Sequence, residues 1–164
     1  MKEIDINEFN YNAFNITKDW ALITAGKKDK FNTMTISWAT FGILWETPIV
    51  MVFIRPHRCT RKFIDEENCF TLSIFDSNFK KELARLGSIS GNDTDKLKDS
   101  ILTPLFIDNY ITFNEANTII ECKVLYKNKL NKDSFIDTSI IDTTYKNNDY
   151  SICYIAKIEK ILVK

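Results

Sequence analysis

Residues 31–61 read FNTMTISWATFGILWETPIVMVFIRPHRCTR, and they carry the main signals of the fold. They contain two runs of strand-forming residues, a short connection, and a basic turn that leads into a helix. The first run, Thr33–Phe41, begins with alternating hydroxyl-bearing and apolar side chains. The second run, Pro48–Ile54, is continuously apolar, which is typical of a strand buried on both faces.

Three hydroxyl groups share one face of the first run, because alternate residues of a strand point to the same side. They belong to Thr33, Thr35 and Ser37. Such a row is unusual on a buried strand, since each hydroxyl needs a hydrogen-bond partner once it leaves water. The alternative is a half-exposed strand whose threonines face solvent.

The basic turn RPHRCT follows the second run. Pro56 fixes the turn and blocks further strand pairing. Arg55 and Arg58 then precede a helix that we expect from Thr60 to about Glu67. A helix start offers free N–H groups and a positive dipole end, so with two guanidinium groups and a hydroxyl it suits a phosphate dianion. The alternative is a solvated basic loop in which Thr60 is only the helix N-cap.

Four motifs in this order resemble the flavin reductase-like proteins of the FMN-binding split-barrel group, which includes flavoredoxin. The resemblance extends from about Trp20 to about Ile161. The motifs are NTMTISW at 32–38, RPHRCT at 55–60, GSISGNDTDK at 87–96 and EANTIIECKV at 115–124.

A mostly β fold is expected on two grounds. About seven short strand-like segments with two or three short helices indicate a closed or partly closed antiparallel β-barrel. The resemblance implies the FMN-binding split barrel, with Greek-key antiparallel strands, in a single flavin reductase-like domain over residues 1–164. It also implies a homodimer with flavin near the subunit interface.

The resemblance implies FMN as the cofactor. It places the ring of the flavin against the NTMTISW strand and brings the lysine of the third motif to the phosphate or ribityl chain. No catalytic side chain and no metal are expected, because the flavin itself carries hydride transfer. The lone His57 is expected to be an exposed loop residue. The predicted cofactor-binding residues are Asn32, Thr33, Met34, Thr35, Ser37, Trp38, Arg55, Pro56, Arg58, Thr60 and Lys96.

The function implied by the resemblance is an FMN-binding oxidoreductase that transfers electrons from NAD(P)H. Two alternatives stay open. One is a flavoredoxin-like FMN electron carrier that takes electrons from a protein partner, and the other is a non-catalytic barrel that has lost flavin. The non-catalytic barrel is motivated by two departures from the family pattern. Ser151 stands where many relatives have a histidine, and Ala156 where they have a glycine.

Composition excludes other classes of function. The 164 residues include 22 basic and 22 acidic side chains, so no global positive charge attracts nucleic acid. The N-terminal segment MKEIDINEFNYNAF is charged and does not read as a secretory signal, and no apolar stretch is long enough to cross a membrane. The four cysteines form no CxxC pair, so reduced thiols in the cytoplasm are expected.

Several further elements are predicted from periodicity and turn residues. We expect Gly87 to end a helix in the left-handed conformation, and Asp93 or Thr94 to cap a short helix that carries Lys96. The remaining expectations are a helix over 78–86, an irregular insert over 102–111, strands over 118–126, 135–141 and 151–163, and a polar hairpin turn over 127–132.

Overall fold

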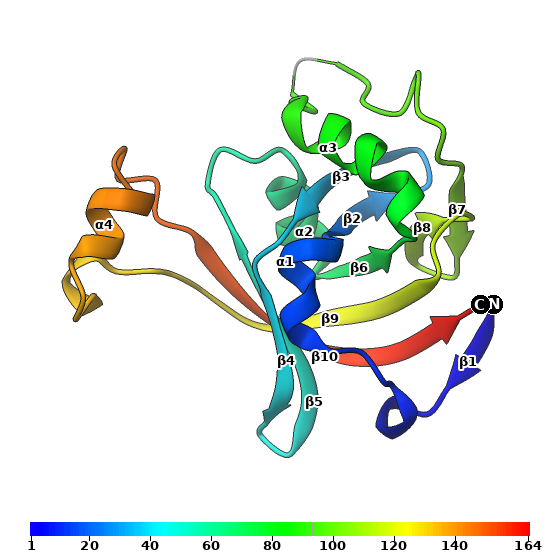
Figure 1. The fold of residues 1–164 in the computed structure, drawn as a ribbon, viewed down its shortest axis with the longest axis horizontal. Coiled ribbons are helices and arrows are strands. Elements are labelled where there is room, and N and C mark those ends of the chain that lie inside the picture. Colours follow the sequence, from blue (N-terminus) through cyan, green and yellow to red (C-terminus); the bar gives the residue numbers. More distant parts are fainter. Residues whose placement is uncertain (93) are drawn as a thin grey trace.

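An antiparallel sheet of eight strands forms the centre of the protein in a computed structural model, which describes residues 1–92 and 94–164 (Figure 1). The strand order is β3-β2-β6-β9-β10-β5-β4, and β1 pairs with β10, which brings the two chain ends together. Two short strands, β7 and β8, form a separate hairpin. The mostly β prediction is confirmed. The strands are β1 Lys2–Ile4, β2 Ala21–Lys27, β3 Lys30–Ile36, β4 Ala39–Leu44, β5 Thr47–Ile54, β6 Cys69–Ile74, β7 Pro104–Ile107, β8 Tyr110–Phe113, β9 Thr118–Lys129 and β10 Ile152–Val163.

Residues 1–92 and 94–164 form four short α-helices, of which α4 lies on an arm that projects from the sheet (Figure 1). Within residues 1–92 and 94–164, none of them is long and apolar enough to cross a membrane. They are α1 Ile16–Asp19, α2 Thr60–Glu67, α3 Lys80–Ser88 and α4 Ser139–Thr144, with 3₁₀ turns at Ile6–Glu8, Ala13–Asn15, Ser77–Phe79 and Lys132–Ser134.

Residues 31–61 connect the two ends of the strand order. β3 pairs with β2, whereas β4 pairs with β5, and these pairs lie at opposite ends of the strand order. The single run expected over 33–41 is therefore two strands, separated by Ser37 and Trp38. One continuous strand is wrong because the chain changes pairing partner at this point. The residues between the two strands are thus placed at an open seam of the sheet.

The apolar run of β5 is buried as predicted on its inner face and half-buried on its outer face. Val50 and Val52 belong to the main core, which also contains the fully buried Tyr154. Ile49 belongs instead to a small cluster on the other face, with Cys153. Full burial of such aliphatic side chains contributes about 1.5–3 kcal/mol each to the stability of the fold. β5 therefore stabilises the hydrophobic clusters on both faces of the sheet.

The helix predicted after the basic turn is confirmed as α2, and Asn68 ends it in the left-handed conformation (φ 54°). The helix over 78–86 is also confirmed, but it continues through Ser88. Gly87 is therefore inside α3 and is not the left-handed cap that we expected. Lys96 lies in a turn and not in a helix. Asp93, which was one of the two residues expected to cap a helix carrying Lys96, lies outside the described residues.

A projecting arm replaces the hairpin expected near the C-terminus. β9 continues to Lys129, and residues 130–151 then leave the sheet and carry α4 before β10 begins (Figure 1, left). The strand predicted over 135–141 is wrong, although its residues are good strand formers. Strand preference depends on a neighbouring strand to pair with, and the arm lies away from the sheet. The insert over 102–111 is likewise more regular than expected, since it contains β7.

Candidate functional site

The basic turn after β5 is folded back onto the first turn of α2. The backbone N–H of Arg58 donates to the carbonyl of Arg55 at 3.1 Å, and that of Arg61 donates to the carbonyl of Arg58 at 3.2 Å. Nε of Arg61 also donates to the carbonyl of Pro56 at 3.0 Å. These bonds fix the direction in which the turn presents its side chains. Pro56 contributes only to the turn, because it lines neither of the pockets described next.

A small pocket of about 90 Å³ lies at the start of α2, and we call it the helix-start pocket. Oγ1 of Thr60 is buried there and has no hydrogen-bond partner in the described part of the chain. An unsatisfied buried hydroxyl costs about 1–3 kcal/mol, so this oxygen fits a polar ligand that would bond to it. The predicted residues that line this pocket are Asn32, Met34, Arg58, Thr60 and Lys96.

Lys96 reaches the helix-start pocket from its turn and is only 5% exposed. Its Nζ donates to the backbone carbonyl of Thr33 at 2.9 Å. Burial, and then the nearby Arg58 guanidinium, lower the pKa of Lys96 to about 8. A bound anion would favour the charged form and raise this pKa again.

Arg58 lies between this pocket and a second one. Its Nη1 donates to the carbonyl of Gly87 at 3.2 Å, near the C-terminal end of α3. A guanidinium has further N–H groups in a fixed fork, which remain available to a ligand. Arg58 therefore joins α3 to the basic turn while presenting positive charge to both pockets.

The second pocket has a volume of about 280 Å³ and lies at the seam between β3 and β4; we call it the strand-end pocket. Trp38 forms its edge and is 44% exposed. The two pockets share Met34 and Arg58, so they adjoin. The strand-end pocket is lined by Met34, Thr35, Ile36, Ser37, Trp38, Phe53, Arg55 and Arg58.

The two threonine hydroxyls of the predicted row are satisfied inside the protein, whereas Ser37 lies beyond β3 and lines the strand-end pocket. Oγ1 of Thr33 lies 2.9 Å from Oγ1 of Thr24 and is fully buried, so it lines neither pocket. Oγ1 of Thr35 donates to the carbonyl of Leu83 in α3 at 2.5 Å. The alternative of threonines that face solvent is therefore wrong for Thr33. Its backbone carbonyl, and not its side chain, contacts the site through Lys96.

Arg55 is engaged by the arm and not by the helix-start pocket. Its Nη1 donates to Oδ1 of Asp149 at 2.5 Å, and its Nη2 donates to the carbonyl of Thr144 at 2.6 Å. The guanidinium also lies 4.5 Å from the ring centroid of Tyr145. The role of Arg55 in binding a phosphate together with Arg58 stays a prediction. In this structure Arg55 lines the strand-end pocket, and its hydrogen bonds fasten the arm.

The two departures from the family pattern lie away from both pockets. Ser151 is fully buried at the base of the arm, where its Oγ accepts from the hydroxyl of Tyr145 at 3.2 Å. Ala156 is fully buried in the main core. His57 is exposed as expected, with its Nδ1 3.7 Å from Oδ2 of Asp149. Neither Ser151 nor Ala156 lines a pocket.

The structure brings together most of the predicted site and adds residues that the sequence did not reveal. Every predicted residue except Thr33 and Pro56 lines one of the two pockets. Asp149 and Tyr145 were missed because they come from a segment about ninety residues after Arg55 and contact it only in the folded chain. No local pattern in the sequence indicates that contact.

Comparisons with known proteins agree with this architecture. A family profile described as flavin reductase like domain matches residues 14–154. No curated protein sequence matches. The fold is similar to that of flavoredoxin from Methanosarcina acetivorans, with 18% identity, a TM-score of 0.71, and coverage of 100% of this chain and 76% of that one.

Two further solved structures have the same fold. The FMN-binding protein from Thermus thermophilus is 17% identical, with a TM-score of 0.68 over 88% of this chain and 69% of that one. The styrene monooxygenase flavin reductase from Pseudomonas putida S12 is 17% identical, with a TM-score of 0.64 over 89% of this chain and 79% of that one. At these identities the likeness establishes the fold alone.

Proposed function

The chain belongs to the flavin reductase like domain family, and on that premise we propose that it binds FMN across the two adjoining pockets and transfers electrons from NAD(P)H through it. The observation that carries this proposal is the pairing of a small cationic pocket with a larger, partly apolar one. The two share Arg58 and Met34. FMN has the same two parts, a phosphate and a flat ring joined by a short chain.

The helix-start pocket has the chemistry that a phosphate requires. It combines the start of α2, the unsatisfied hydroxyl of Thr60, and the cations Arg58 and Lys96. Charge-assisted hydrogen bonds to a phosphate are about twice as strong as neutral ones. Asn32 lines the same pocket. These residues would hold the phosphate and fix the position of the whole cofactor.

The strand-end pocket has the chemistry that a flavin ring requires. Trp38, Met34 and Phe53 give it apolar walls, and the end of β3 brings backbone and hydroxyl groups to one edge. When bound, the flavin supplies the electron transfer itself. The chain contributes by binding the ring, by orienting it, and by limiting the access of water on its walled side.

The reductase proposal is tested by anaerobic addition of NADH or NADPH to the protein with stoichiometric FMN. We expect the flavin absorption to bleach, with oxidation of one nicotinamide per flavin. FMN that binds but is reduced by neither nicotinamide would contradict the reductase and leave FMN binding intact.

A flavoredoxin-like electron carrier is the second candidate. It is favoured by the exposure of Trp38, which lines the strand-end pocket. Because part of the pocket lining faces solvent, a protein partner could approach a flavin bound there. Rapid reduction of the bound flavin by a ferredoxin-type donor, with none by NADH or NADPH, is the result expected for this carrier.

We propose a homodimer as the working form. Beyond the core cluster of Ile49, the outer face of the β5–β10 sheet presents the half-buried Met51 and Phe53. Trp45 at the tip of the β4–β5 hairpin is 59% exposed, and Ile136 on the arm is 98% exposed. Contiguous exposed apolar patches mark contact surfaces, and we assign the dimer contact to these groups. The four free cysteines fit a reducing compartment such as the cytoplasm.

A further inference from the structure

Three residues stand between the helix-start pocket and a larger pocket beside it. Asn32, Gly91 and Lys96 line both, and we call these three residues the wall. The neighbour, which we call the outer pocket, has a volume of about 710 Å³, against about 90 Å³ for the helix-start pocket. Gly91 packs closely against Asn32 in this wall, since a Cβ added to Gly91 would lie 2.3 Å from Nδ2 of Asn32. These packed residues stand between the two pockets on this side.

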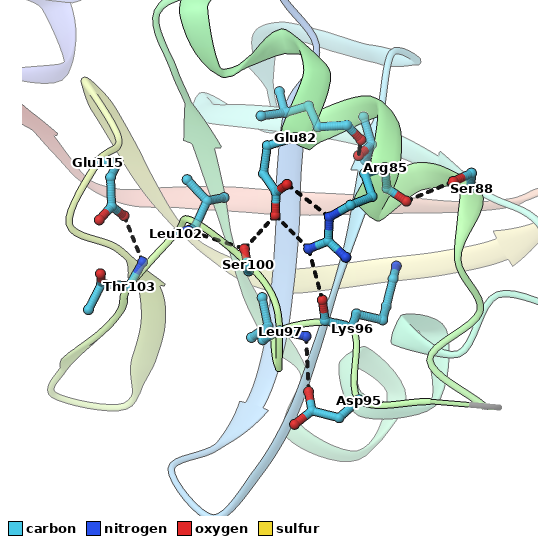
Figure 2. A network of polar contacts seen from close by, with 12 residues as sticks. Glu82, Arg85, Ser88, Asp95, Lys96, Leu97, Ser100, Leu102, Thr103 and Glu115 are labelled. Carbon is cyan, nitrogen blue, oxygen red and sulfur yellow. Dashed lines mark hydrogen bonds and ion pairs between the residues drawn. The ribbon is translucent and has the colours of Figure 1, made fainter.

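A network of polar side chains fixes the wall from outside the pocket, and we call Glu82, Arg85 and Ser100 the clamp (Figure 2). Nε and Nη2 of Arg85 donate to the two carboxylate oxygens of Glu82 at 2.9 and 2.6 Å. Oγ of Ser100 donates to the same carboxylate at 2.5 Å. Nη2 of Arg85 also donates to the backbone carbonyl of Lys96 at 3.1 Å. The clamp thus ties the wall to α3.

The clamp is built as a rigid support. Glu82 is 7% exposed, and its hydrogen bonds from Arg85, helped by that from Ser100, hold its pKa below the usual range against the opposing effect of burial. A buried carboxylate with a two-pronged guanidinium partner has one well-defined geometry. On the other side of the wall, Nζ of Lys96 is bound to β3 through the carbonyl of Thr33. Lys96 is therefore held at both its backbone and its side-chain end.

We propose that the clamp makes this site selective for FMN over FAD by holding the wall closed behind the phosphate. This inference rests on the proposed function, because it assumes that the flavin phosphate lies in the helix-start pocket. FMN ends at that phosphate, whereas FAD continues from it into a second phosphate and an adenosine. Besides the strand-end pocket, the outer pocket is the described cavity that shares lining residues with the helix-start pocket. Its lining includes Phe31 and Phe63, and an adenosine that bound there would have to pass the wall.

The test measures the dissociation constants of FMN, FAD and riboflavin for the full-length protein. Wild type should bind FMN more tightly than FAD by at least roughly tenfold, the effect of one charged hydrogen bond. Arg85→Gln, which releases the carbonyl of Lys96, should lower this FMN-to-FAD ratio at least about fivefold. Riboflavin affinity should not change, because riboflavin has no phosphate to place. Lys81→Gln removes the same charge from an exposed position of α3 and should leave the ratio unchanged.

Ser100→Ala keeps every charge and removes one hydrogen bond of the clamp, so it is the variant to use if Arg85→Gln does not fold. It should also lower the FMN-to-FAD affinity ratio, but by a smaller factor. Wild type that binds FMN and FAD equally would overturn the inference, as would clamp variants that weaken all three flavins to the same extent. Both of those results leave FMN binding in place, whereas a protein that binds no flavin refutes the proposed function as well.

Discussion

At the scale of single residues, the phosphate assignment depends on Thr60, Arg58 and Lys96. Thr60 contributes the clearest sign of an absent partner, a buried hydroxyl without a hydrogen bond in the described residues. Arg58 and Lys96 contribute charge, and each is already oriented by one backbone carbonyl. A phosphate would complete contacts that the folded chain leaves open.

Replacing Arg58 tests this assignment. Arg58→Ala should weaken FMN binding by about 1.5–3 kcal/mol, the range for a hydrogen bond to a charged group. The fold should persist, because the side chain belongs to a turn. Isothermal titration with FMN and with riboflavin gives the measurement, and riboflavin is the control because it lacks the phosphate. Equal FMN affinity in the variant and the parent protein would mean that the phosphate lies elsewhere.

Lys96 predicts a pH dependence of FMN binding. Its pKa in the free protein is about 8, mainly because of burial. Above that pH the amine is neutral, so binding the phosphate requires uptake of a proton, and the affinity falls by up to about tenfold per pH unit. Below pH 8 the amine is already charged, and above about pH 7 the phosphate is a dianion. We therefore expect little change in FMN affinity between about pH 7 and pH 8.

The measurement is the dissociation constant of FMN from about pH 7 to 9.5 in wild type and in Lys96→Met. The variant should show weaker binding at neutral pH and a flat profile above pH 8, since it has no amine to titrate. A wild-type profile as flat as that of the variant would show that Lys96 does not pair with the phosphate.

At the scale of elements, the arm is fastened to the body by Arg55. The ion pair to Asp149 joins the start of the basic turn to the end of the arm, and the ring of Tyr145 covers the guanidinium. Both side chains are roughly a fifth to a quarter exposed (21% and 25%), so this fastening is local. It sets the position of the arm more than it sets the stability of the barrel.

Asp149→Asn should therefore loosen the arm and leave the barrel folded. We expect the free energy of unfolding to fall by about 1 kcal/mol or less, as for ion pairs close to solvent. Limited proteolysis should cut the arm faster in the variant than in wild type. Asp142→Asn makes the same change at an exposed position of α4 and is the control. Unchanged cleavage in Asp149→Asn would refute the fastening role of Arg55.

The elements also show what could be predicted from sequence. α2 and β5 were predicted closely because their signals are local: a basic turn with a proline, and a continuous apolar run. The strand over 33–41 was predicted as one because its residues favour strands throughout, and only the pairing of the folded sheet divides it. The same limit explains Arg55, whose partner Asp149 is distant in the sequence.

At the scale of the whole molecule, we propose that part of the exposed apolar surface contacts a second copy of the chain. The groups that we assign to this contact lie on the outer face of β5, on the tip of the β4–β5 hairpin, and on the arm. The strand-end pocket is lined by Phe53, from the same outer face of β5, and by Arg55, which is hydrogen-bonded to the arm. A second copy that covered these surfaces would therefore lie beside the site.

Light scattering after size exclusion should give a mass twice that of the 19.1 kDa chain. Ile136→Asp should shift the protein toward the monomer, because it puts a charge on the most exposed apolar side chain of the arm. Ile101→Asp is the matched control, since Ile101 is also exposed (63%) but lies outside the arm. A wild-type protein that stays monomeric at high concentration would contradict the dimer.

A titration of the purified protein with FMN and with riboflavin tests whether the two adjoining pockets bind FMN. We expect saturation at one FMN per chain, with riboflavin bound at least roughly tenfold more weakly because it leaves the helix-start pocket empty. Equal binding of the two flavins would contradict the phosphate site, and binding of neither would contradict FMN binding as a whole.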